Sequence, residues 1–107
     1  MAYFGENAAE VTCAWNANSS VAGSTGVSSV SDTGTGNSRV NFSSSFSNTG
    51  YAAVMGGAAS NTGGAWDSFI NCNRKNTNNI SVMIAFPGGQ TNGGSGGANT
   101  NLACFPN

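Results

Sequence analysis

The side chains that could perform acid–base or nucleophilic chemistry are few in this sequence. It contains no histidine, which excludes Ser-His-Asp and Cys-His catalytic arrangements and every zinc site with an imidazole ligand. The four carboxylates are Glu6, Glu10, Asp32 and Asp67, and their spacing does not suggest the close pair that a glycosidase needs. Asp32 with nearby Thr and Asn oxygens offers too few carboxylates for a calcium site. The sequence therefore favours a protein that is not an enzyme and that carries no cofactor or metal.

The three cysteines lack the spacing of a metal or redox motif. Cys13, Cys72 and Cys104 are far apart, and no Cys-x-x-Cys pair is present. Without a base to activate it, none is expected to be a catalytic nucleophile. Each lies in an apolar run (VTCAW, FINCN and LACF), where cysteine behaves as a small hydrophobic residue. We expect reduced, buried thiols in a protein made in a cytosol. The alternative, a disulfide bond between two of the three cysteines, is not decided by the sequence.

The charge of the chain narrows the classes of partner. Charged residues make up 7% of the sequence, and the net charge is −1. Nucleic-acid binding rests on clustered Lys and Arg, whereas only Arg39, Arg74 and Lys75 are basic here, the last two predicted at the solvated tip of a turn. The N-terminus lacks the pattern of a signal peptide, and no stretch approaches the roughly 20 apolar residues of a membrane helix. Neither nucleic acid nor a membrane is an expected partner.

The elements that position these side chains are predicted to be short strands. Residues 10–15 alternate Val11, Cys13 and Trp15 on one face, and further strands are predicted at 26–30, 38–42, 51–56, 66–72, 79–86 and 101–105. Gly-rich segments at 56–65 and 87–100 are predicted loops, and no window repeats apolar residues at helical spacing. About seven short strands predict an all-β fold, a small antiparallel β-sandwich or jelly-roll-like domain without significant helix. Residues 1–9 are interpreted as an N-terminal arm and 10–107 as one β domain.

The most ordered pattern is the stretch SSVSDTGTGNSRVNF at residues 28–42, which predicts a β-hairpin. An aspartate is expected to begin the turn by accepting hydrogen bonds from the turn's own amides, and two glycines can supply positive φ angles. The reversal would direct a valine of each strand into one core. The residues expected to specify this part of the fold are Asp32, Gly34, Gly36, Val30, Val40 and Phe42.

Residues 14–54 resemble a module that recurs in structural proteins of tailed bacteriophages. The resemblance rests on an Ala-Trp strand, a variable loop, a Val-Ser-Ser-Val-x-Asp-x-Gly-Thr-Gly hairpin, a Val-Asn-Phe strand and a later strand with Tyr and Val. The chain departs from the module after the second glycine of the hairpin, where Asn-Ser-Arg replaces a frequent Asp-Tyr-Thr. The matching positions are Trp15, Val27, Val30, Asp32, Gly34, Thr35, Gly36, Val40, Asn41, Phe42, Tyr51 and Val54.

The resemblance implies a structural protein displayed on the virion surface and made in the host bacterial cytoplasm. Such proteins occur in tail fibres and at other surface positions, often as trimers. We expect a capsid decoration or cement protein, or a short fibre or knob subunit. It would work through contacts with itself, as a homotrimer, and with the major capsid or tail proteins. Tyr3 and Phe4 of the arm are the residues expected to anchor the chain to the particle.

An alternative of a different class is a tail-fibre tip or other glycan-binding module that recognises host surface polysaccharide. Trp15, Tyr51 and Trp66 could stack on sugar rings, and Asn-rich loops could bond to sugar hydroxyls. Because all three aromatic residues lie within strand patterns, packing in the core is the favoured role for them.

Overall fold

The structure is a computed structural model, and it describes residues 9–16, 20–34, 37–57, 69–86, 89–90 and 100–106. Within these residues the chain forms nine strands in two antiparallel sheets, with no helix. The four-stranded sheet has the order β2-β1-β9-β5 and consists of β1 (Val11–Trp15), β2 (Val21–Thr25), β5 (Ala52–Gly57) and β9 (Thr100–Phe105). The five-stranded sheet has the order β3-β4-β7-β6, with β8 added to β7, and consists of β3 (Val27–Gly34), β4 (Asn37–Phe42), β6 (Phe69–Lys75), β7 (Asn79–Phe86) and β8 (Gly89–Gln90).

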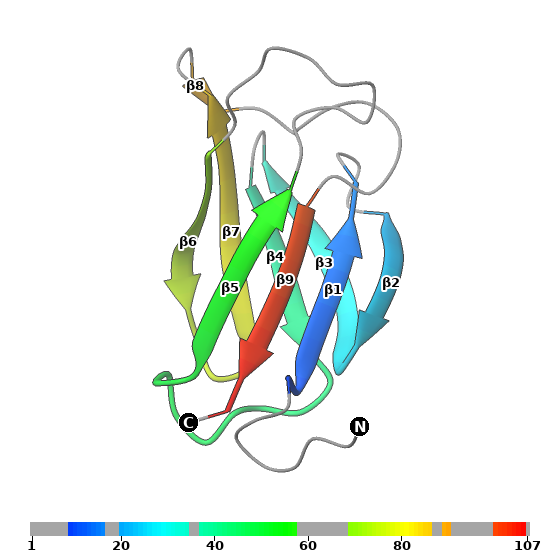
Figure 1. The fold of residues 1–107 in the computed structure, drawn as a ribbon, viewed down its shortest axis with the longest axis vertical. Helices are drawn as coiled ribbons and strands as arrows, with labels where there is room; N and C mark the ends of the chain where they lie inside the picture. The colour runs from blue at the N-terminus through cyan, green and yellow to red at the C-terminus, as the bar shows by residue number, and fades with distance from the viewer. Residues whose placement is uncertain are drawn as a thin grey trace.

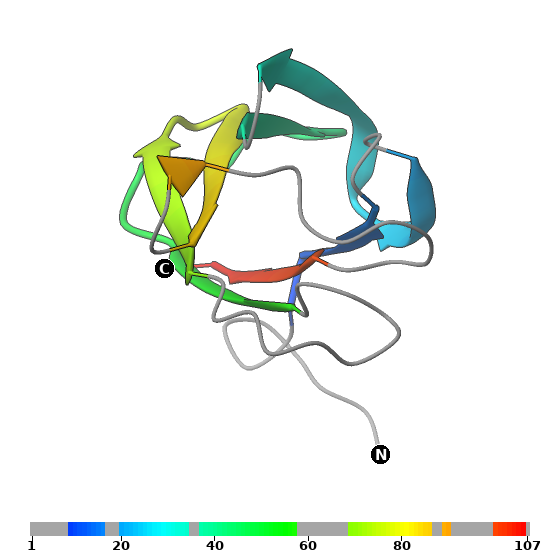
Figure 2. The same ribbon diagram turned by 90° about the horizontal axis from the view of Figure 1, so that it is seen from above.

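The two sheets face each other, as Figures 1 and 2 show, and the predicted all-β sandwich is confirmed. The chain passes from one sheet to the other at Gly26, between β2 and β3. Gly26 has a φ angle of 69°, and a Cβ at this position would collide with the carbonyl oxygen of Glu10. The Gly26 carbonyl in turn accepts a 2.9 Å hydrogen bond from the N–H of Ser43. Only glycine fits this crossing without displacing the backbone around it.

The core lies between the sheets and follows from alternation along the strands. The inward positions of β1 and β9 are buried, while those between them are exposed or half-buried. Strand β4 alternates in the same way, and β7 lies between β4 and β6. The largest fully buried side chains are Trp15, Tyr51, Ile80, Val40, Val82, Thr100 and Cys104.

Most of the strand predictions are confirmed, and β7 has the predicted bounds of 79–86. Strand β2 was missed, because Val21–Thr25 contains Gly, Ser and Thr without apolar alternation and all five residues are exposed. The prediction of a turn at Arg74 and Lys75 was wrong, since both residues belong to β6 and pair with β7. Within the Gly-rich segment after β7, Gly89–Gln90 forms the short strand β8.

No helix among the described residues has the length and apolar character that crossing a membrane would require.

Candidate functional site

The β3–β4 hairpin places its predicted residues in two different environments. Val30 pairs with Val40, and both contact the core, although only Val40 is fully buried. At the exposed end, a carboxylate oxygen of Asp32 accepts a 3.0 Å hydrogen bond from the N–H of Gly34, whose φ angle is 143°. Strand β3 continues past Asp32 to Gly34, so the turn begins later than the sequence suggested. Gly36 lies outside the described residues.

Asn41 holds the outer face of this hairpin together. Its side-chain amide donates hydrogen bonds to the hydroxyl oxygens of Ser29, at 3.0 Å, and Ser31, at 3.1 Å. The Ser28 hydroxyl donates to the Asn41 carbonyl oxygen across the same two strands, at 3.1 Å. We call these four residues the polar clamp. The clamp gives a structural role to the asparagine of the Val-Asn-Phe pattern, which the sequence matched but did not explain.

An aromatic cluster of Phe42, Phe46 and Tyr51 closes one end of the sandwich. The Phe46 and Tyr51 rings are stacked, with centroids 4.3 Å apart, and Phe42 meets both rings edge to face. All three side chains are buried. Edge-to-face and stacked aromatic pairs add stability beyond the area that they bury.

Tyr51 also makes polar contacts that connect the two sheets. It precedes β5 of the four-stranded sheet, and its hydroxyl donates a 2.8 Å hydrogen bond to the Asn76 carbonyl between β6 and β7. The Lys75 ammonium donates a 2.8 Å hydrogen bond to the Tyr51 carbonyl and lies 5.0 Å from the centre of its ring. Burial raises the pKa of the Tyr51 hydroxyl to about 12. The phenol is therefore held in its neutral, hydrogen-bond-donating form.

Two of the three aromatic residues considered for glycan stacking, Trp15 and Tyr51, are buried. Trp15 and Tyr51 each have 1% of their surface exposed, so neither presents a ring face to a ligand from solvent. Trp66 lies outside the described residues, as do Tyr3 and Phe4 of the predicted arm.

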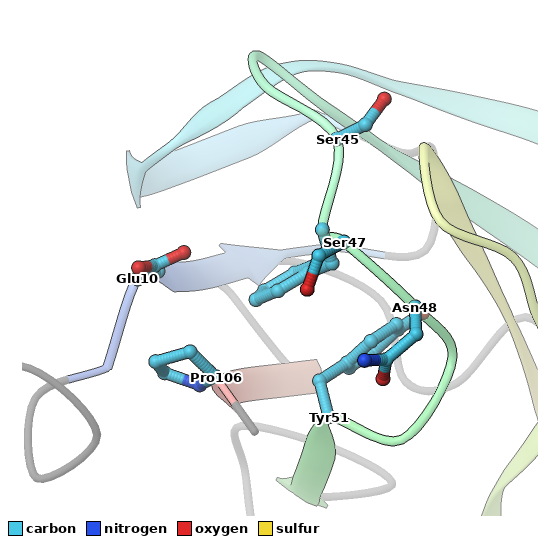
Figure 3. A pocket seen from close by; sticks show the side chains of 7 residues that line it. Glu10, Ser45, Ser47, Asn48, Tyr51 and Pro106 are labelled. Carbon is cyan, nitrogen blue, oxygen red and sulfur yellow. The ribbon is translucent and has the colours of Figure 1, made fainter.

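A cavity of about 250 Å³ opens beside the aromatic cluster (Figure 3). Glu10 reaches it from the start of β1, Pro106 from the end of β9, and the loop between β4 and β5 supplies most of the remaining wall. The polar lining groups are one carboxylate, two serine hydroxyls and the amide of Asn48. Such a lining can hydrogen-bond a small polar group, but a lone carboxylate supplies no acid–base pair. No group of three or more His, Cys, Asp or Glu side chains that could hold a metal occurs among the described residues.

The cysteines are three free thiols in two kinds of environment. Cys13 and Cys104 are buried as expected, and burial raises the pKa of each from 9.0 to about 11. The prediction that Cys72 is buried was wrong, because it lies on the edge strand β6 next to an irregularity in the pairing with β7 and is exposed. The two buried thiols are thus kept protonated and unreactive, since the thiolate is the nucleophile.

Charge is divided unevenly between the two sheets. The strands of the four-stranded sheet contain no charged residue, whereas those of the five-stranded sheet contain Asp32, Arg39, Arg74 and Lys75. Arg39 and Arg74 are exposed and lie in one row across the sheet, because Ser81 pairs with Arg39 on one side and with Arg74 on the other. The two arginines are far apart in the sequence, and only the strand order brings them together.

No family model, no curated protein and no solved structure matches this chain in the comparisons with known proteins. What the structure itself defines is an antiparallel β-sandwich with one uncharged sheet and one sheet that carries every charged residue of the described strands.

Proposed function

We propose that this chain is a non-enzymatic structural protein of a tailed-bacteriophage virion, displayed on the particle surface. Its role would be that of a capsid decoration or cement protein, or of a subunit of a short fibre or knob. It works through contacts with copies of itself, as a homotrimer, and with the major capsid or tail proteins. The observation that carries the proposal is the nature of its exposed strand residues, which are short and almost all uncharged.

The four-stranded sheet illustrates this surface most clearly. All of β2 is exposed, and its sequence VAGST contains neither a charge nor a long side chain. On β5, the exposed residues are Ala52, Val54 and Gly56, and Val54 has 60% of its surface accessible. Covering such a surface with another protein costs little, because no charge loses its hydration. Small side chains also let a neighbouring backbone approach closely.

Several of the positions that resemble the phage module have structural roles in this chain, which supports the proposal at the level of fold. Trp15, Val40, Phe42 and Tyr51 are buried in the core. Asn41 belongs to the polar clamp. A pattern made of such residues specifies a scaffold, and the exposed surface around it is left to make contacts.

The proposal is tested with particles that lack the chain, produced from a phage genome in which its gene is deleted. Purified chain added to these particles should co-sediment with them at a fixed number of copies per particle. A chain without residues 1–9 should remain folded by circular dichroism and fail to attach. The double variant Tyr3→Ala, Phe4→Ala keeps the length of the arm and should attach as weakly as the deletion. Failure of the intact chain to co-sediment would overturn the proposal.

The oligomeric state gives an independent test of the trimer. Multi-angle light scattering at high protein concentration should give three times the chain mass of 10.7 kDa. A monomer throughout the concentration series would contradict the trimer.

A further inference from the structure

The outer face of the five-stranded sheet carries a row of side chains that could bind carboxylates. Register places Ser31, Arg39, Ser81 and Arg74 side by side on β3, β4, β7 and β6. Their neighbours along β4 and β7 show which face this is, since Val40, Ile80 and Val82 point into the core. The two arginine Cα atoms are two strand spacings apart, about 10 Å. We call these four residues the arginine row.

The charges of the row are not neutralised within the described part of the chain. The described carboxylates are Glu10 and Asp32, and neither forms an ion pair with Arg39 or Arg74. Lys75, the remaining basic residue, is instead engaged with Tyr51. The positive charge on this face is thus carried by the two exposed guanidinium groups.

The polar residues beside the row are suited to the same partner. Two residues further along the same strands, Ser29, Asn41 and Asn79 form a parallel row of uncharged hydrogen-bonding side chains. The Asn41 amide is already held by the serine hydroxyls, so this part of the face is ordered before any partner binds. Pre-ordered side chains lose less conformational entropy on binding.

We propose that the outer face of the five-stranded sheet docks an acidic surface of another protein, with Arg39 and Arg74 each binding a carboxylate and Ser81 hydrogen-bonding between them. Arginine suits this role because its planar fork of donors matches a carboxylate and is weakly hydrated. The inference rests on the proposed function and names the face and the partner chemistry for one of its assembly contacts.

The structure favours a different protein over a second copy of this chain or a polysaccharide. A second copy offers its described carboxylates singly, Glu10 before β1 and Asp32 on β3, and one Asp32 oxygen already accepts a hydrogen bond from Gly34. Small-molecule ligands are bound mainly in concave sites, and we expect the same of the single sugar units of a polysaccharide. The cavity found among the described residues lies beside the aromatic cluster, away from the arginine row.

The test is a titration of isotopically labelled chain with poly-L-glutamate, followed by NMR at low salt. Amide shifts should be largest around the arginine row, and affinity should fall steeply as salt is added. The double variant Arg39→Gln, Arg74→Gln should bind at least about tenfold more weakly. Adding Thr12→Lys and Thr25→Lys to this variant restores the net charge on the four-stranded sheet, and binding should stay weak.

Three results would overturn the proposal. The first is poly-L-glutamate binding that is absent at low salt or unchanged in the double variant. The second is binding of the carboxylated polysaccharide polygalacturonate as tightly as poly-L-glutamate, which would show that this face binds any polyanion and is not specific for an acidic protein. The third is self-association of the chain that the double variant abolishes, which would make a second copy the occupant. Co-sedimentation with particles is measured separately, so failure here leaves the test of the proposed function intact.

Discussion

Asn41 and Phe42 are consecutive residues of β4 whose side chains serve opposite sides of the sandwich. Asn41 belongs to the polar clamp, where its partners come from the adjacent strand β3 and are largely exposed. Phe42 belongs to the aromatic cluster, which is buried and which joins β4, the following loop and the start of β5. Hydrogen bonds that compete with water contribute little net stability, whereas buried aromatic contacts contribute much. The clamp therefore organises a surface, and the cluster holds the fold.

The largest effect is expected from removing the centre of the cluster. Tyr51→Ala should lower the free energy of unfolding by about 3–5 kcal/mol, because it leaves a cavity against Phe42 and Phe46. Tyr51→Phe keeps the ring and loses the hydroxyl bond to Asn76, so it should cost only about 1–2 kcal/mol. Urea unfolding measures both. Equal losses for the two variants would show that the ring contacts contribute little.

Alanine substitutions at two glycines test how strongly the crossing between the two sheets depends on a residue without a side chain. Gly26→Ala should cost about 2–4 kcal/mol, because it combines an unfavourable φ angle with a collision against the Glu10 carbonyl. Gly23→Ala on β2 is the matched control, since a Cβ there meets nothing within 4 Å. The control should be neutral or slightly stabilising in thermal unfolding. A Gly26→Ala variant as stable as this control would contradict the account of the crossing.

Alkaline pH should lower the free energy of unfolding through the ionisable groups of the buried interior. The polar clamp contributes nothing to this decline, because it contains no ionisable side chain. The folded pKa values of Cys13 and Cys104, about 11, and of Tyr51, about 12, lie above their ordinary values of 9.0 and 10.0. The unfolded chain therefore loses these protons first, so stability is full below about pH 9 and falls as pH rises through the folded values. Urea midpoints between pH 8 and 12 measure this. In Tyr51→Phe, the part of the decline above pH 10 should be smaller.

The smallest effect is expected at the polar clamp. Asn41→Ala removes two side-chain hydrogen bonds, one exposed and one partly buried, and should cost about 1 kcal/mol. Asn41→Asp is a useful companion variant, because a carboxylate can accept bonds from the two serines but brings a negative charge beside Arg39. Asn41→Asp should therefore clearly lower the affinity for poly-L-glutamate while it changes the melting temperature little. If Asn41→Ala lowered the free energy of unfolding as much as Tyr51→Ala does, the polar clamp would stabilise the fold as strongly as the aromatic cluster, contrary to expectation.

Alternation of apolar residues was sufficient to predict most of the sandwich. Val11, Cys13 and Trp15 share a buried face because successive strand side chains point to opposite sides, and this holds wherever one face is covered. Strand β2 escaped prediction because it is exposed throughout, so burial imposes no pattern on it. Its position follows from pairing with β1, which is information that its own residues do not contain.

The surfaces were harder to predict than the core. Asp32 and Gly34 act within three residues of each other, so local spacing was informative for them. The contact of Lys75 with Tyr51 and the arginine row depend on which strands become neighbours. The spacing of residues in the sequence does not reveal the order of the strands in a sheet. The burial of Cys72 was mispredicted for the same reason, because its apolar run is typical of a central strand, whereas β6 is an edge strand.

The role proposed for this chain is that of a structural subunit on the surface of a phage particle. Electron cryomicroscopy of intact particles and of particles that lack the chain tests it most directly. We expect difference density on the outer surface, repeated in groups of three at a capsid or tail position, into which the two-sheet sandwich fits. Identical reconstructions of the two particles, with the chain absent from purified virions by mass spectrometry, would contradict it.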